Sequence, residues 1–413
     1  MAGHDINFPG MAEAERPGHV PADRVINWDV YGLPAKGAID YAMAYKDLQD
    51  AGRLPDIFWT PLNGGHWVAA RADIISQVLE DHETFSSRHS TVPVQRNAGP
   101  RLLPVQADPP ESQKYRIFFN RALSPKQVQT LAGTARATAI ELIDGFKDRG
   151  HCEFVSEFAY HLPVRIFMQI AGLPGDDRLM LLDLVHRIMR GRDDTELAQA
   201  RGELGGYALA MIRERRANPG PDAISEMAAA TVDGELIPEQ TLVGMTVLML
   251  LAGLDTVAGM MGFFMWHLAR NPEQRRSLRE HPEKVPGAVD ELLRRYAIVT
   301  QTRTLVKDLE YDGVLLRAGD LICAPTALHS LDERIFANPR EVDFDRKGLN
   351  VAFGGGVHRC AGANLARTEL RILLEEWLPR IPDFELDPAG KPVIAGAAVA
   401  VLAELPLIWQ RRS

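Results

Sequence analysis

Cys360 stands in the segment of the sequence that points most directly to chemistry. Three consecutive glycines, Gly354 to Gly356, precede it, and a helical pattern of apolar residues follows from Ala363 to Trp377. Glycines let backbone amides approach a sulfur atom, and the amino end of a helix favours negative charge. We therefore expect a depressed thiol pKa, and a thiolate serves as a nucleophile or a metal ligand, including the axial ligand of a haem iron. Zinc is disfavoured because no second cysteine lies at a ligand spacing, and a core cysteine beside a glycine turn is the alternative.

A second chemical pair, Asp255 and Thr256, interrupts an otherwise apolar helical stretch from about Thr241 to Leu268. Burying a carboxylate and a hydroxyl there costs free energy unless both find partners, and Gly253 weakens the helix beside them. Either the pair acts on something bound nearby, or Thr256 bonds back to a preceding carbonyl at a harmless kink.

Glu291 and Arg294 are an acid and a base spaced i, i+3, which places them on one face of a helix. Such a pair is usually a solvated surface bridge, so alone it proves little.

The elements that must position these residues are mostly helical. Ser124–Pro125 and Asn271–Pro272 are typical helix starts, and Asp108, Pro109 and Glu111 form a capping-box pattern that predicts another. Helical periodicity continues through 132–146, 162–170, 179–189 and 207–212. Short β-rich pieces at 66–70, 302–306, 314–316, 321–324 and 399–402 predict small hairpin sheets at the edge. The fold class is therefore mainly α with small β-sheets (α+β).

Length and composition limit the remaining possibilities. The chain has 413 residues, and a net charge of −9 argues against a surface built for nucleic acid. The three cysteines are too few for a disulfide framework, and the charged, proline-containing start lacks a secretory signal, so we expect a cytoplasmic protein. The apolar run 242–254 is too short for a membrane span and is interpreted as a buried core helix. We expect one domain over 1–413, with an N-terminal extension at 1–24 and a proline-rich substrate-access lid at 91–110.

The segment Phe353-Gly354-Gly355-Gly356-Val357-His358-Arg359-Cys360-Ala361-Gly362 resembles the F-G-x-G-x-H-x-C-x-G signature of the haem-thiolate monooxygenases, the cytochromes P-450. The resemblance implies a single triangular fold with a long central helix over a haem b. It makes Cys360 the ligand of the haem iron, with Phe353 packed beside the sulfur and Gly354 in the haem-binding loop. His358, Arg116 and Arg303 then occupy positions from which this family pairs the haem propionates, although a lone arginine is more often a surface charge.

The other two motifs take family roles as well. Glu291 and Arg294 become the E-x-x-R pair that supports the cysteine loop, with Arg346 as its third member. Asp255 and Thr256 become the end of the A-G-x-D-T oxygen-activation motif in a locally opened helix. Thr256 is then expected to stabilise the oxygen bound at the iron, and Asp255 to connect a proton path to solvent.

Further segments resemble the bacterial camphor-hydroxylating branch, which implies electrons from NADH through a flavin reductase and a [2Fe-2S] ferredoxin. Basic residues at Arg71, Arg116, Lys347 and Arg367 could dock such an acidic partner, or could be ordinary surface charges. Pro100 stands where camphor enzymes have a tyrosine that binds the substrate ketone, so camphor is a doubtful substrate. The residues expected to line the substrate pocket, with plain core packing as the alternative, are Leu102, Leu248, Leu251, Val299 and Val399.

These features favour O₂-dependent insertion of one oxygen atom into a C–H bond of a small terpenoid or norisoprenoid, such as an ionone-like ketone. A haem-thiolate peroxygenase or isomerase, and a haem sensor without turnover, are the alternatives. The pair Asp255–Thr256 counts against both, because neither needs a proton path to dioxygen.

Overall fold

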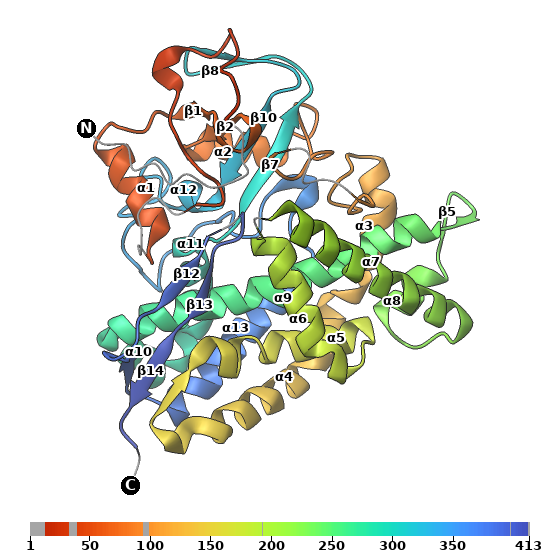
Figure 1. The fold of residues 1–413 in the computed structure, drawn as a ribbon. Coiled ribbons are helices and arrows are strands. Elements are labelled where there is room, and N and C mark those ends of the chain that lie inside the picture. The colour runs from red at the N-terminus through yellow and green to blue at the C-terminus, as the bar shows by residue number, and fades with distance from the viewer. Residues whose placement is uncertain (1–12, 33–38, 94–98, 192, 397, 412–413) are drawn as a thin grey trace.

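The computed structural model describes residues 13–32, 39–93, 99–191, 193–396 and 398–411. Helices dominate and the sheets are small, as the sequence predicts (Figure 1). The α-helices are α1 Tyr41–Asp50, α2 Ala72–Glu80, α3 Glu111–Ala122, α4 Pro125–Phe146, α5 Leu162–Ala171, α6 Arg178–Arg190, α7 Asp194–Ala217, α8 Ala223–Ala228, α9 Glu239–Arg270, α10 Pro272–Glu280, α11 Val285–Arg295, α12 Thr326–Ser330 and α13 Ala363–Arg380.

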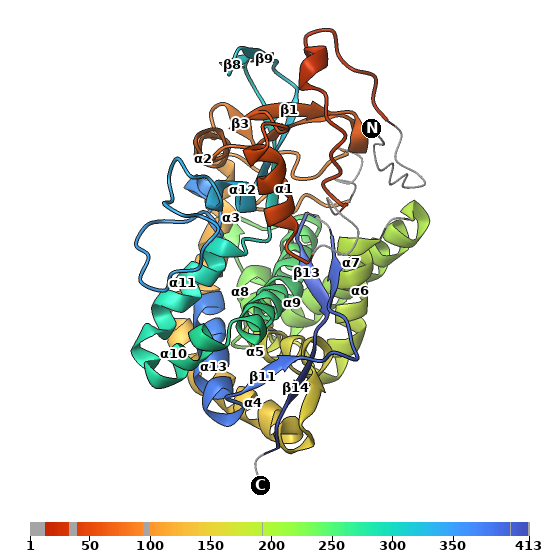
Figure 2. The same ribbon diagram turned by 90° about the vertical axis from the view of Figure 1, so that its left-hand side faces the viewer.

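Helix α9 is the centre of the molecule. Figure 2 looks nearly along it and shows α5, α6, α13 and β13 around it. It is long and apolar enough to cross a membrane by length and composition, but 61% of its most apolar window is buried inside the protein. This identifies the apolar run as the core helix that we expect from the sequence.

Glycines let other elements approach α9 closely. A Cβ added to Gly244 would lie 2.0 Å from the Arg101 carbonyl oxygen in the lid segment, and one on Gly253 would lie 2.2 Å from the Phe167 ring of α5. Gly259 faces Val401 in the same way, at 2.6 Å. Each of these crossings therefore requires the absence of a side chain on α9.

The strands assemble further than the sequence predicts. The pieces at 66–70, 302–306 and 321–324 join one five-stranded sheet in the order β1-β2-β10-β7-β3. The piece 314–316 pairs with β8, and 399–402 overlaps β13, which pairs with β12; both are two-stranded antiparallel sheets, as predicted. The expectation of small hairpins is wrong for the first three pieces, because β10 pairs with β2 from the start of the chain. The strands are β1 Ile57–Thr60, β2 His66–Ala69, β3 Phe85–Ser86, β4 His151–Glu153, β5 Thr231–Val232, β6 Glu235–Leu236, β7 Thr300–Leu305, β8 Leu309–Tyr311, β9 Val314–Leu316, β10 Leu321–Pro325, β11 Phe384–Leu386, β12 Val393–Ala395, β13 Val401–Glu404 and β14 Pro406–Trp409.

Two of the three predicted helix starts are correct and one is not. Helices α4 and α10 begin at the prolines after Ser124 and Asn271. Asp108 does not cap α3, because its carboxylate instead accepts hydrogen bonds from the Ser86 hydroxyl at 2.6 Å and the Ser87 amide at 2.8 Å. Glu111 binds Arg101 rather than completing a capping box.

Residues 94–98 of the predicted lid lie outside the described residues. Residues 1–12 of the predicted N-terminal extension lie outside them as well. The described part of the lid is anchored. Leu103 and Ala107 are buried, and Arg101 holds the Gln106 carbonyl at 2.7 Å as well as Glu111. The lid therefore rests on α9 at Gly244.

Candidate active site

The glycine loop places Cys360 directly before α13. Gly354 and Gly356 have φ of +70° and +57°, and a Cβ on Gly356 would lie 2.8 Å from the Leu79 carbonyl oxygen of α2. Gly356 therefore lets the loop pack onto the end of α2, whereas a Cβ on Gly354 would meet the Gln301 side chain at 3.1 Å. The Cys360 amide donates to the Phe353 carbonyl at 2.9 Å, which closes the loop. The described contacts of the Phe353 ring include the Arg367 guanidinium, 4.6 Å from its centre.

The Cys360 thiol does not have the depressed pKa that we expect from the sequence. Removal of water by the surrounding protein raises its pKa, and the Gly362 amide together with Arg116, Arg359 and Arg367 opposes this without overcoming it. The residue is nevertheless exposed, so its sulfur lies open to an approaching group. A metal ion bound at the sulfur would replace the proton and stabilise the thiolate that the protein alone does not.

Three nitrogen-bearing side chains near the cysteine loop have no hydrogen-bonded carboxylate partner among the described residues. Arg303 is buried, and its guanidinium donates to the Thr302 carbonyl and the Gln301 amide oxygen, at 2.8 and 2.9 Å. Burial lowers the pKa of Arg303 to about 10, although Asp108 opposes the shift.

His358 is the second of the three, and both of its ring nitrogens are buried without a hydrogen-bond partner. Burial and the positive charges of Arg303 and Arg116 lower its pKa to about 4. Arg116 is half-buried and donates to the Arg359 carbonyl. Such a set of unpaired donors is suited to an anion, and the two propionates of a haem fit it.

The middle of α9 presents an open face. Ala252 is exposed, while Leu248, Leu251 and Thr256 are half-buried within a helix that is otherwise largely buried. Their spacing puts them on one side of α9. The Thr256 hydroxyl donates to the Ala252 carbonyl at 2.9 Å within an uninterrupted helix, so the locally opened helix that we expect from the sequence is absent here. The residues of this site fit a haem bound through Cys360.

Asp255, the neighbour of Thr256, is 1% exposed and lies against α6. Arg190 of α6 donates to both carboxylate oxygens at 2.6 and 2.7 Å, and His186 Nε2 lies 3.4 Å from Oδ1. Burial alone would raise the pKa of Asp255, but His186 and Arg190 outweigh it and lower that pKa overall. Sequence analysis did not identify these two partners. Their i, i+4 spacing on an amphipathic helix is the signal that could have suggested them.

Glu291 and Arg294 are a buried pair rather than a surface bridge. Arg294 donates to both Glu291 oxygens at 2.8 Å, and the side chains are 3% and 2% exposed. Arg346 joins the same carboxylate at 3.0 Å, as the resemblance implies, and Arg294 also binds the Ser330 and Pro339 carbonyls. The trio thus ties α11 to the loops that precede the cysteine segment.

The residues expected to line the substrate pocket are all half-buried. Leu248 and Leu251 share the open side of α9, and Val299 pairs with Val399 in a β-bridge. Leu102 lies in the lid, where its amide donates to the Gln106 side chain at 2.7 Å. Described contacts join Val299 to Val399, but none joins these two to the leucines.

The basic residues expected to dock a partner differ in availability. Arg71 is 12% exposed and binds Asp56 at 3.0 Å and Glu333 at 2.9 Å. Its charge is therefore already neutralised, and we no longer count it among the residues that could dock a partner. Arg367 is paired with Asp290 at 2.7 Å, Arg116 is half-buried, and Lys347 is exposed. Arg359, which lies outside the expected set, is exposed as well.

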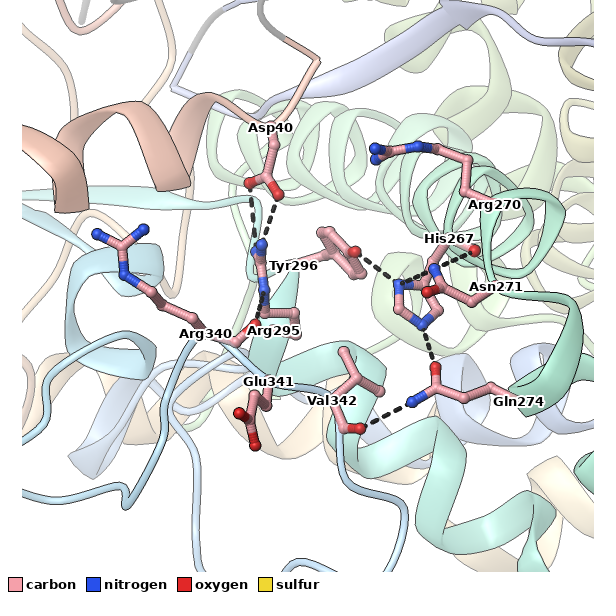
Figure 3. A pocket seen from close by; sticks show the side chains of 10 residues that line it. All are labelled: Asp40, His267, Arg270, Asn271, Gln274, Arg295, Tyr296, Arg340, Glu341 and Val342. Carbon is pink, nitrogen blue, oxygen red and sulfur yellow. Dashed lines mark hydrogen bonds and ion pairs between the residues drawn. The ribbon is translucent and has the colours of Figure 1, made fainter.

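A separate polar cavity of about 450 Å³ lies between the ends of α9 and α11 (Figure 3). Most of its polar side chains bond one another: His267 contacts Tyr296 at 2.7 Å and Gln274 at 2.6 Å, and Arg295 holds Asp40. It shares no lining residue with the cysteine site.

The chain is similar to known proteins over most of its length. The cytochrome P450 family model matches residues 57–394. Probable cytochrome P450 127A1 of Sinorhizobium fredii is 34% identical over 402 residues, which cover 95% of this chain and 96% of that protein. Pentalenic acid synthase of Streptomyces avermitilis is 32% identical over 356 residues, covering 84% and 87%.

Two solved structures have nearly the same fold. CYP101C1 and CYP101J2 are 37% and 35% identical to this chain, and each superposes with a TM-score of 0.87 over 96% of this chain and 100% of its own. With the family match over most of its length and the open cysteine beside unpaired cations, the chain belongs to the cytochrome P450 family of oxidoreductases, whose cofactor is haem b.

Proposed function

We propose that this cytochrome P450 inserts one atom of O₂ into a C–H bond of a small hydrophobic terpenoid or norisoprenoid, with an ionone-like ketone as the favoured substrate. The observation that carries this proposal is the exposed Cys360 beside two buried groups: Arg303, which among the described residues donates to neutral acceptors, and His358, whose ring nitrogens have no described partner.

In this proposal Cys360 holds the haem iron, and Arg116, Arg303 and His358 bind the propionates. Glu291, Arg294 and Arg346 hold the adjoining loops in place. The bound haem supplies the binding and reductive activation of O₂. The protein excludes water, orients the substrate and delivers protons.

Thr256 and Asp255 provide the proton delivery. The Thr256 hydroxyl lies on the open side of α9 and donates to the Ala252 carbonyl, so it must leave that acceptor to donate toward a ligand. Asp255 is its chain neighbour and binds Arg190 of α6. The two side chains thus lie about 100° apart around α9, one against α6 and one toward the open side.

The substrate would lie against Leu248 and Leu251, beneath the lid, with Leu102, Val299 and Val399 completing an apolar pocket. Pro100 lies at the contact between the lid and Gly244, 3.4 Å from the position of a Cβ there, and offers no hydroxyl. A camphor-like ketone would lose a hydrogen bond worth about 1 kcal/mol at this position. A longer apolar molecule can replace that loss with burial.

Electrons would come from NADH through a ferredoxin reductase and a [2Fe-2S] ferredoxin in the cytoplasm. Lys347 and Arg359 offer exposed positive charge beside the cysteine loop, and Leu349 between them is 93% exposed and offers an apolar contact. This combination suits a transient acidic partner.

The first test is the visible spectrum of the purified protein, reduced and treated with carbon monoxide. The wild type should give the red-shifted Soret band of a thiolate-ligated haem, and Cys360→Ser should lose it. A wild type that does not take up haem would contradict the proposal.

The second test measures the substrate. Substrate-induced spectral shifts should be stronger with ionones than with camphor, and tight camphor binding would remove the argument from Pro100. Turnover with NADH, reductase and ferredoxin should exceed turnover with peroxide alone. Thr256→Ala should consume NADH with less product, and unchanged coupling would disprove its role.

A further inference from the structure

His186 of α6 is the feature that the mechanism above leaves unused. Its Nε2 is buried, has no other hydrogen-bond partner among the described residues, and lies 3.4 Å from Asp255 Oδ1. Arg190, one turn further along α6, holds the same carboxylate at 2.6 and 2.7 Å. Asp255 therefore meets two nitrogen-bearing side chains, both on one face of α6.

The two side chains differ in their chemistry as proton donors. An arginine guanidinium stays protonated in proteins, whereas histidine side chains gain and lose a proton in the physiological range. Arg190 can therefore orient the carboxylate but cannot donate a proton to it. A proton that leaves Asp255 must be replaced from somewhere else, and His186 is the neighbour able to supply it.

His186 also connects the buried carboxylate to solvent. Its side chain is 31% exposed, while Asp255 is 1% exposed. The Tyr160 ring packs against the imidazole with 4.8 Å between ring centres. Burial and the negative charge of Asp255 raise the pKa of Tyr160 to about 12, so this phenol stays neutral and fixes the ring without competing for the proton.

The charged and titratable groups that face His186 are therefore few. Asp255 approaches from α9 and Tyr160 from the segment before α5, and Arg190 lies on α6 itself. Arg187, the next residue on α6, is engaged elsewhere, with Asp183, Glu196 and Glu203.

From this arrangement, and resting on the monooxygenase function proposed above, we infer that His186 is the positioning residue through which protons enter from solvent to Asp255. The imidazolium transfers its Nε2 proton to Asp255 Oδ1 and keeps its second proton on Nδ1. Solvent water that reaches the bare Nε2 then restores the imidazolium. Asp255 passes the proton on toward the Thr256 side of α9 and returns to the carboxylate that Arg190 orients. One proton enters and one leaves in each cycle, and no other bond changes.

The test compares His186→Gln with His281→Gln. His281 is a surface histidine that also faces a carboxylate, Glu283 at 3.3 Å, but it is not connected to Asp255. With the reconstituted electron chain, His186→Gln should lower product formation on the order of tenfold, at or below the low end for groups that transfer protons. It should also lose the fall in rate with rising pH that deprotonation of an imidazolium donor produces, whereas His281→Gln should keep both.

A second readout does not depend on turnover. In the reduced, carbon monoxide-bound holoenzyme, the ring ¹⁵N signals of His186 should move in Asp255→Asn and stay in place in Glu283→Gln. If they do not move, His186 and Asp255 do not interact in solution and the relay is disproved.

The outcomes separate the two proposals. A wild type that forms no product with any electron source overturns the monooxygenase function. An active wild type whose His186→Gln variant keeps its rate and pH profile overturns the relay alone.

Discussion

Arg303 illustrates the cost of burying a charged side chain without a carboxylate partner among the described residues. Its cation is 3% exposed and has only neutral acceptors, which is why the pKa of the guanidinium falls. The protein therefore buries an uncompensated charge, and the propionate of a bound haem would compensate it.

We expect Arg303→Met to speed haem loss to an apoprotein acceptor by roughly tenfold to a hundredfold, because a hydrogen bond to a charged group contributes about 1.5–3 kcal/mol. The apoprotein should be no less stable, since the variant no longer buries a cation. Arg71→Met, at a mostly buried ion pair with Asp56 and Glu333, is the control and should leave haem loss unchanged. Equal haem loss in both variants would remove Arg303 from the site.

At the level of single residues, the sequence predicted most of the site correctly and part of it incorrectly. The motif around Cys360 led to His358, Arg116 and Arg303, and the structure brings all of them together. The direction of the Cys360 pKa was wrong, because desolvation depends on neighbours that no local pattern contains. His186 and Arg190 were missed because they lie more than 60 residues from Asp255 in the chain and meet it only through packing.

At the scale of elements, α9 differs from an ordinary amphipathic helix in the use of its glycines. Gly253 faces the Phe167 ring of α5, whereas Gly205 of α7 has nothing within 4 Å of an added Cβ. The same substitution should therefore have opposite effects in the two helices.

We expect Gly253→Ala to lower the free energy of unfolding by about 1–3 kcal/mol through overpacking. Gly205→Ala should raise it by roughly 0.5–1 kcal/mol, because alanine is the better helix former. Denaturant unfolding of the two variants measures both. Stabilisation by Gly253→Ala would mean that Phe167 moves aside freely.

The long helices were predictable because their apolar periodicity is local to each segment. The sheet was not, because β2 and β10 join across some 250 residues. Asp108 was misassigned for the same reason: its carboxylate binds Ser86 and Ser87 on a neighbouring element instead of capping its own helix.

For the molecule as a whole, Glu369 on α13 makes stability depend on pH. It is 1% exposed, and neither carboxyl oxygen has a hydrogen-bond partner among the described residues. Burial raises its pKa to about 8 from an ordinary 4.5. The folded protein then holds a proton that the unfolded chain releases, so stability falls as pH rises from about 4.5 to 8.

Glu369→Gln should remove this fall. The difference in unfolding midpoint between variant and wild type should widen by about 1–2 °C per pH unit between pH 5.5 and 7.5, since each unit costs at most about 1.4 kcal/mol. Glu375→Gln, on the same helix but paired with Arg136, should show no such widening. A constant difference for Glu369→Gln would mean that its carboxyl finds a partner in solution.

The contact between the lid and α9 has a consequence for which molecules can enter. Because the Arg101 carbonyl of the lid lies directly against Gly244, the absence of a side chain at this position sets how closely the lid can approach α9. A methyl group at this position would hold the lid away from α9 and would admit larger molecules. We therefore expect the size of the molecules that can enter to depend on residue 244, at the contact with the lid, rather than on the residues that line the pocket.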